Sequence, residues 1–211
     1  MPKKNYSALL KSDANSLGLN LTDVQIKQLL QYLDLLRQWN TVHNLCAAAS
    51  YEHMLAYHIL DSLSVAANLD LANQQILDVG TGAGLPGVPL AIVIPSCQIT
   101  LLDAKEKKIS FIQHAINTLQ LTNITAINSR IENYQPQNKF NLVISRAFAS
   151  LDDFVKLAAR LCSEEGKLIT MKSNSKEFSV NTVIADNYQI VEIKKLVVPG
   201  IASERCLVIV R

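Results

Sequence analysis

The spacing of apolar side chains predicts that the first third of the chain is helical. Over residues 22–45 they recur every three or four positions, which indicates an amphipathic helix that Thr22 or Asn20 can cap. A polar, helix-like segment precedes it, and a second helical stretch covers about residues 51–67. No linker rich in proline, glycine or serine follows. We therefore expect residues 1–72 to form a helical extension packed on the rest of the chain.

From residue 73 onwards, short β-rich runs alternate with helical stretches. The strands are predicted near 75–79, 98–103, 124–128, 140–145 and 166–171. The helices between them are predicted near 87–94, 105–120, 151–162 and 175–185. Two last runs, 188–198 and 205–210, predict an antiparallel pair. This alternation indicates a mostly parallel, seven-stranded sheet with helices on both faces, so residues 73–211 are predicted to form one compact, Rossmann-like α/β unit.

Composition excludes some classes of protein. The chain has 211 residues, of which 49% are hydrophobic, enough for one sizeable core. No apolar stretch approaches the roughly 20 residues that span a bilayer, and the N-terminus has no signal-peptide core. We expect a cytoplasmic protein with no membrane partner, and a monomer. The four cysteines lack the paired spacing of a zinc or redox site, so we expect reduced, mostly buried thiols and no metal.

Charge adds little to this picture. The net charge of +2 is too small to indicate a partner. No lysine or arginine lies between Arg37 and Lys105, so basic residues are frequent in the C-terminal half. They could form a face that meets phosphate groups, or they could belong to a mixed, solvated surface.

A glycine-rich loop follows the first predicted strand in ILDVGTGAGLPG, residues 76–87. Gly80, Gly82 and Gly84 allow a tight turn that a ligand can approach closely, at the sheet edge where doubly wound folds bind ligands. A pyrophosphate would sit poorly beside Asp78, whereas a ligand with a sulfonium and an ammonium group would be attracted to it. The loop therefore favours S-adenosylmethionine over a dinucleotide, although residues 82–87 also match the dinucleotide pattern GxGxxG.

The ends of the next strands supply further candidates. Asp103 can accept hydrogen bonds from both ribose hydroxyls of either cofactor. Ile131 and Glu132 could meet an adenine edge, or they could begin a surface helix. Arg146 could hold the cofactor carboxylate, a phosphate or guanine O6, and Phe148 could stack on an extruded base or belong to the core.

The chemistry at the fourth strand depends on the methyl acceptor. An exocyclic amine needs a polar loop of the Asn/Asp-Pro-Pro-aromatic type, and a base carbon needs a thiol nucleophile, but neither stands beside Arg146. A guanine N7 already has an in-plane lone pair and no proton to lose. It needs orientation alone, so we expect Arg146 to position the reactants and no general base to act.

Taken together, these motifs resemble one family, the bacterial small-subunit ribosomal RNA methyltransferase G, also called glucose-inhibited division protein B. The matching segments are Trp39-Asn40, Asn44-Leu45, HILDSL at 58–63, DVGTGAGLPG at 78–87, LLD at 101–103, SRAFA at 145–149, Met171-Lys172 and Glu204-Arg205. The resemblance implies the class I fold of S-adenosylmethionine-dependent methyltransferases. It also implies methylation of N7 of guanine 527, in the 530 loop of 16S rRNA, either naked or in the 30S subunit or its precursor.

Site residues also follow from the resemblance. It implies cofactor contacts at Gly80, Leu85, Ile131, Glu132 and Arg146, with Asp103 as a ribose ligand. We add Asp78, Gly82 and Gly84 as cofactor-binding residues, and His58, Phe148, Lys172 and Arg205 as candidates for RNA contact. His58 and Asp61 lie three positions apart, so they could face the cleft or could lock the helices onto the sheet.

The chain departs from the family pattern at two positions. That pattern often has a basic residue before the histidine of HILDSL and a glycine after Met-Lys, where this chain has Tyr57 and Ser173. If the basic residue contacts phosphate, this chain has one anchor fewer. Two other function classes stay open: an NAD-dependent oxidoreductase, because of the GxGxxG match, and a non-catalytic RNA- or ribosome-assembly-binding module.

Overall fold

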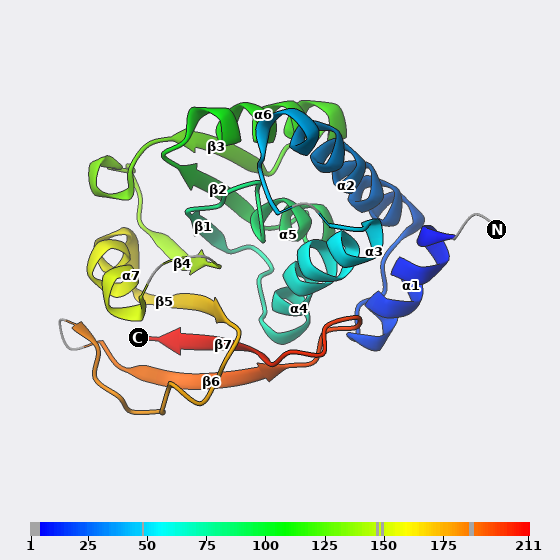
Figure 1. Ribbon diagram of the computed structural model, residues 1–211. Coiled ribbons are helices and arrows are strands. Elements are labelled where there is room, and N and C mark those ends of the chain that lie inside the picture. The colour runs from blue at the N-terminus through cyan, green and yellow to red at the C-terminus, as the bar shows by residue number, and fades with distance from the viewer. Residues whose placement is uncertain (1–4, 48, 147, 149, 186–187) are drawn as a thin grey trace.

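A mixed β-sheet forms the centre of the computed structural model, which describes residues 5–47, 49–146, 148, 150–185 and 188–211. Over these residues the sheet has seven strands in the order β3-β2-β1-β4-β5-β7-β6 (Figure 1). The strands are β1 (Gln75–Val79), β2 (Gln98–Asp103), β3 (Ile124–Asn128), β4 (Phe140–Ser145), β5 (Cys162–Lys172), β6 (Ile190–Leu196) and β7 (Arg205–Val210). β1 to β5 are parallel, and β7 runs antiparallel to β5 and β6. The predicted sheet and its antiparallel end are confirmed.

The order of the strands fixes where a ligand can bind. β1 pairs with β2 on one side and with β4 on the other, so the chain changes direction across the sheet at this point. Crevices form outside the carboxyl ends of strands at such a switch point. The predicted glycine loop leaves β1 there.

Helices cover the two faces of the sheet unequally (Figure 1). The helices are α1 (Tyr6–Ser16), α2 (Asp23–His43), α3 (Tyr51–Met54), α4 (Asp61–Asn68), α5 (Gly87–Val93), α6 (Glu106–Leu119) and α7 (Leu151–Ala158), with a π-helical turn η1 (Leu55–Leu60) and 3₁₀ turns η2 (Ile131–Asn133) and η3 (Ala159–Leu161). Only α7 of these α-helices packs on the face that carries Leu77 and Val79; Ile76 points to the opposite face, in the core shared with α2, α5 and α6. In the described ranges, no helix is long and apolar enough to cross a bilayer.

The N-terminal helices are bonded directly to the sheet unit. Thr22 caps α2 as predicted, in a reciprocal capping box with Gln25. Gln25 Nε2 also donates to the carbonyls at the end of α5, and the buried Tyr32 hydroxyl donates to Ala83 O in the glycine loop at 2.5 Å. Helix α2 therefore supports the loop from behind. The domain boundary at residue 72 stays a prediction.

This bond predicts a measurable role for α2. Tyr32→Phe is expected to lower the free energy of unfolding by about 1–2 kcal/mol, because the buried Ala83 carbonyl loses this donor. Urea unfolding would measure the change. Tyr134→Phe, which removes a hydroxyl from a half-buried ring elsewhere, is the matched control. A loss in Tyr32→Phe no larger than in that control would contradict the role.

The predicted helix over residues 175–185 is wrong. The segment contains turns and an isolated bridge between Val183 and Gln189, and its Val180 and Val183 side chains are exposed. Its backbone instead follows the sheet edge, where Asn181 N donates to Ile190 O at 2.8 Å and Ile190 N donates to Thr182 O at 3.0 Å. The segment is not helical because its backbone pairs with a neighbouring strand, and the spacing of apolar residues cannot reveal such pairing.

The predicted helix over 151–162 and strand over 166–171 also need correction. Helix α7 ends at Ala158, and after η3 the strand β5 already begins at Cys162. Gly166 permits this extension, since a Cβ there would lie 2.5 Å from Cys162 Sγ and 2.9 Å from Asn141 O. The pairing of β4 with β5 shifts register nearby, between Phe140 and Leu142.

Candidate functional site

The glycine loop presents bare backbone at the carboxyl end of β1. Gly80 and Gly82 have φ values of +66° and +63°, and a Cβ at Gly80 would meet nothing within 4 Å. A Cβ at Gly82 would lie 3.5 Å from Lys108 Nζ. Gly84 has a different role, because a Cβ there would come within 2.6 Å of Val88 Cγ2. Gly84 and Leu85 are buried, and their predicted contact with the cofactor stays a prediction.

Asp78 is fully buried beneath this loop. Its Oδ2 accepts hydrogen bonds from Thr81 Oγ1 at 2.7 Å and from Gly87 N at 3.0 Å. Its Oδ1 has no hydrogen-bond partner among the described residues. Burial raises the pKa of Asp78 to about 6, against the lowering effect of these hydrogen bonds. The structure thus keeps one buried acceptor without a donor, directly behind a loop open to a ligand.

A glycine-loop cleft of about 190 Å³ runs along the ends of β1, β2 and β3. It is lined by Val79, Gly80, Leu102, Asp103, Ala104, Ser129, Arg130, Ile131, Glu132 and Phe148. Asp103 is held in place within it: Oδ2 accepts from Gly82 N, and Oδ1 accepts from Lys105 N, both at 2.9 Å. Lys108 Nζ lies 3.7 Å from the same Oδ2. The carboxylate is therefore fixed at the rim with a cation beside it.

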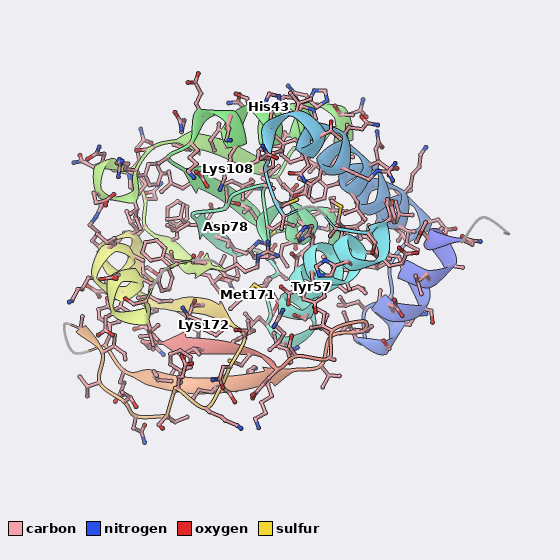
Figure 2. All side chains as sticks on the ribbon, viewed as in Figure 1. His43, Tyr57, Asp78, Lys108, Met171 and Lys172 are labelled. Atoms are coloured by element: carbon pink, nitrogen blue, oxygen red, sulfur yellow. The ribbon has the colours of Figure 1, made fainter. Side chains whose placement is uncertain are left out.

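A second pocket, the arginine pocket, lies toward β4, β5 and β7 and has a volume of about 370 Å³. It is lined by His53, Tyr57, His58, Asp61, Arg146, Met171, Lys172, Ser173 and Arg205. Figure 2 shows Tyr57, Met171 and Lys172 where the end of β5 approaches the α3–α4 helical segment. Because β7 is antiparallel, its first residue reaches the same sheet edge as the last residues of β4 and β5.

Asp61 joins the two arginines of this pocket. Arg146 Nη1 lies 3.7 Å from Asp61 Oδ2, and Arg205 Nε lies 3.4 Å from Oδ1. Arg146 Nη1 also donates to Tyr57 O at 3.1 Å. Asp61 is 5% exposed, and its burial raises the pKa while the two guanidinium charges oppose the rise. One carboxylate thus orients two cations toward a shared cavity.

His58 is electrically neutral in this setting. Burial, helped by the charge of Arg146, lowers the pKa of His58 to about 4. Both ring nitrogens are buried and have no hydrogen-bond partner among the residues that the structure describes. A neutral imidazole offers one donor and one acceptor, so His58 can still bond to a group that enters the pocket.

Tyr57 contributes an aromatic surface where the family pattern often has a basic residue. Its ring stacks on His53, with 4.0 Å between centroids and an interplanar angle of 4°. The Arg205 guanidinium carbon lies 5.5 Å from the centre of the same ring. The wall of the pocket is therefore a row of flat groups, suited to stacking.

Comparison with known proteins identifies the family. The model described as rRNA small subunit methyltransferase G matches residues 25–208. Ribosomal RNA small subunit methyltransferase G of Haemophilus influenzae (strain PittEE) is 44% identical over 194 residues, which is 92% of this chain and 94% of that protein. Its counterpart in Salmonella paratyphi B is 42% identical over 207 residues, or 98% and 97% of the two chains. The chain belongs to the rRNA small subunit methyltransferase G family.

Solved structures agree on the fold. A SAM-dependent methyltransferase from Aquifex aeolicus superposes with a TM-score of 0.55 at 17% identity, covering 75% of this chain and 92% of that one. A SAM-dependent methyltransferase from Thiobacillus denitrificans, in complex with S-adenosyl-L-homocysteine, gives 0.53 at 15% identity, covering 74% and 71%. The predicted Rossmann-like methyltransferase fold is confirmed for this member of the family.

The predicted site residues of this family member fall into two groups. Gly80, Asp103, Ile131 and Glu132 line the glycine-loop cleft, whereas His58, Arg146, Lys172 and Arg205 line the arginine pocket. The other predicted cofactor residues are not among the lining residues of these two cavities: Asp78, Gly82, Gly84 and Leu85. Phe148 does not join the other RNA candidates: it lines the glycine-loop cleft and its ring centre lies 5.6 Å from that of Phe154. Ala147 and Ala149 of the SRAFA segment lie outside the described residues.

Sequence reasoning missed three members of the site. Lys108 reaches Asp103 and the Gly82 backbone from the first turn of α6, a position that the predicted helix start could have indicated. His53 and Met171 reach the arginine pocket through the packing of the helices on β5, for which the sequence carries no local signal.

Proposed function

We propose that this protein transfers a methyl group from S-adenosylmethionine to N7 of guanine 527 in 16S rRNA. The observation that carries the proposal is the buried, half-satisfied Asp78 behind an open glycine loop, in a chain that belongs to the rRNA small subunit methyltransferase G family. When bound, the cofactor supplies an electrophilic methyl on a sulfonium, beside an ammonium and a carboxylate. The remaining steps concern the residues of the protein.

The glycine-loop cleft suits the adenosine and amino-acid parts of this cofactor. Asp78 Oδ1 offers an acceptor with no donor among the described residues, which fits a cationic ligand better than a pyrophosphate. Asp103 can accept from ribose hydroxyls, with Lys108 stabilising its charge. Ile131 and Glu132 line the same cleft and can meet the adenine edge, and Phe148 provides an apolar wall.

The arginine pocket suits the nucleotide that accepts the methyl group. The N7–CH₃ bond forms with the N7 lone pair as the S–CH₃ bond breaks, so positive charge moves from sulfur to the purine and N7 loses no proton. The protein must therefore orient the base, and a neutral His58 fits an acceptor that becomes cationic. Arg146, Arg205 and Lys172 exceed the single negative charge of Asp61 and can hold RNA phosphates.

The test is methylation of a defined RNA. The protein is incubated with labelled S-adenosylmethionine and either naked 16S rRNA or 30S particles, and the modified base is mapped. Label at N7 of guanine 527 is expected in at least one substrate. The matched control carries 7-deazaguanine at that position, which lacks the acceptor nitrogen and should stay unlabelled. No label in the 530 loop of either substrate would overturn the proposal.

Calorimetry separates the competing cofactor. S-adenosylhomocysteine is expected to bind, and NADH is not, because the buried acid Asp78 behind the glycine loop disfavours a pyrophosphate there. Tight binding of NADH, with no binding of S-adenosylhomocysteine, would contradict this expectation and favour an oxidoreductase.

A further inference from the structure

We propose that Asp61 recognises the target guanine by accepting hydrogen bonds from its N1–H and 2-amino groups. The inference rests on the proposed function and adds a specificity-determining residue to it. Asp61 lines the arginine pocket, and its Oδ1 has no hydrogen-bond partner of normal geometry among the described residues, although Arg205 is close enough for an ion pair. The carboxylate thus has acceptor capacity left for a base that enters the pocket.

The shape of guanine determines which edge of the base can face each of the two cavities. N7 lies at one end of guanine, and the 2-amino group lies at the opposite end. If N7 faces the glycine-loop cleft, where a methyl donor would bind, the Watson–Crick edge must point away from that cleft. Arg146, which directly follows β4, and Asp61 of α4 both line the arginine pocket, with Arg146 Nη1 3.7 Å from Asp61 Oδ2. Asp61 is the one carboxylate among the described residues that line this pocket, so it is the candidate acceptor for that edge.

A carboxylate distinguishes guanine from adenine by its hydrogen-bonding capacity. Guanine presents two adjacent donors, N1–H and the 2-amino group, which match the two acceptor oxygens. Adenine presents a bare N1 lone pair, which would face the negative charge, and it has no 2-amino group. Because Asp61 is 5% exposed, water competes little for these bonds and a mismatch leaves a buried acceptor unsatisfied.

The neighbours of Asp61 support this role. Arg146 and Arg205 hold the carboxylate from two sides, which fixes its orientation and favours its charged form. The stacked rings of His53 and Tyr57 give the pocket a flat wall, and Met171 adds an apolar contact. A volume of about 370 Å³ lies within the range of roughly 300–1,000 Å³ for small-ligand sites. The pocket can therefore hold a flipped base and read its edge.

The experiment compares guanine with inosine, which lacks only the 2-amino group, at the target position of otherwise identical rRNA. Wild-type protein is expected to methylate the guanine RNA about tenfold more efficiently than the inosine RNA, as kcat/KM. In Asp61→Asn this ratio is expected to fall to about threefold or less, because an amide cannot accept from both donors. Asp70→Asn, which changes an exposed acid, should keep the wild-type ratio.

The ratio separates recognition from a merely structural role. If Asp61 only holds the two arginines, Asp61→Asn will slow both RNAs equally and retain the tenfold preference, which would overturn the inference. Equal use of guanine and inosine by the wild type would overturn it without any variant. Absence of N7-methylguanine in the guanine RNA with wild-type protein would instead remove the proposed function on which the inference rests.

Discussion

Replacing Arg146 with alanine is expected to lower the rate of methyl transfer to rRNA at least about a hundredfold. Arg146 lines the arginine pocket, where it donates a hydrogen bond to the Tyr57 carbonyl and forms an ion pair with Asp61. Its removal would leave the buried Asp61 with one cation fewer and would free the base to misalign with the methyl donor. Single-turnover kinetics at saturating S-adenosylmethionine would measure this chemical step directly.

Two controls separate the role of Arg146 from a general loss of charge. Arg146→Lys keeps the cation but replaces the planar guanidinium fork with a compact ammonium on a flexible chain, so its rate should lie between those of wild type and Arg146→Ala. Lys156→Ala removes an exposed cation from α7 that lines neither cavity, and it should leave the rate unchanged. If cellular N7 methylation survives unchanged in a strain that carries Arg146→Ala while ribosome binding falls, the non-catalytic binding module is favoured.

The elements of the sheet could be predicted because burial on both faces imposes a local pattern. Each parallel strand is a short apolar run, and a helix or turn follows it. The glycine loop could also be predicted from the sequence as a ligand-binding turn, since a strand that ends in an acid before alternating glycines has few structural uses. By contrast, residues 175–185 carry apolar side chains at helix-compatible positions, and only pairing with Ile190 across the sheet edge determines that they form turns.

The roles of individual residues in the loop could not be separated by sequence. Gly80, Gly82 and Gly84 look alike, but Gly80 and Gly82 face open space or a lysine tip, whereas Gly84 lies against the Val88 side chain. Phe148 was open to two interpretations, and its side chain faces the glycine-loop cleft rather than the arginine pocket. Whether a glycine serves a ligand or the core depends on atoms that are distant in sequence.

The arginine pocket was the least predictable part of the site. Its charged residues come from α4, the end of β4, the end of β5 and the start of β7, which share no local motif. The spacing of His58 and Asp61 suggested one helical face, but it left open whether they face a cleft or the core. The π-helical turn η1, which places Tyr57 and His58 at the pocket together, has no clear sequence signature.

Asp78→Asn is expected to stabilise the ligand-free protein at neutral pH and to weaken cofactor binding at least tenfold. Burial raises the folded-state pKa of Asp78 to about 6, above its ordinary value of 3.8. The folded state therefore binds the proton more tightly than the unfolded state does. The contribution of Asp78 to stability is fully present below pH 3.8, and it falls as the pH rises from 3.8 to 6.

The cost of the buried charge sets the size of the effect. A shift of this extent corresponds to about 3 kcal/mol of lost stability above pH 6. Asparagine removes the charge, and its carbonyl oxygen can still accept from Thr81 and Gly87. The difference in free energy of unfolding between variant and wild type should therefore grow from pH 4 to pH 7 by about 1–3 kcal/mol and then level off.

Two measurements test this prediction. Denaturant unfolding of wild type and Asp78→Asn across this pH range measures the stability effect, and calorimetry with S-adenosylhomocysteine at pH 7.5 measures cofactor binding. The difference in free energy of unfolding between the two proteins is compared, because the titration of all other groups is common to both and cancels. Thr81→Ser, which keeps a hydroxyl donor to Asp78, should change neither quantity strongly. A difference that stays flat with pH would mean that Asp78 carries no unusual charge cost. Retained cofactor affinity would mean that the unpaired oxygen of Asp78 does not contact the cofactor.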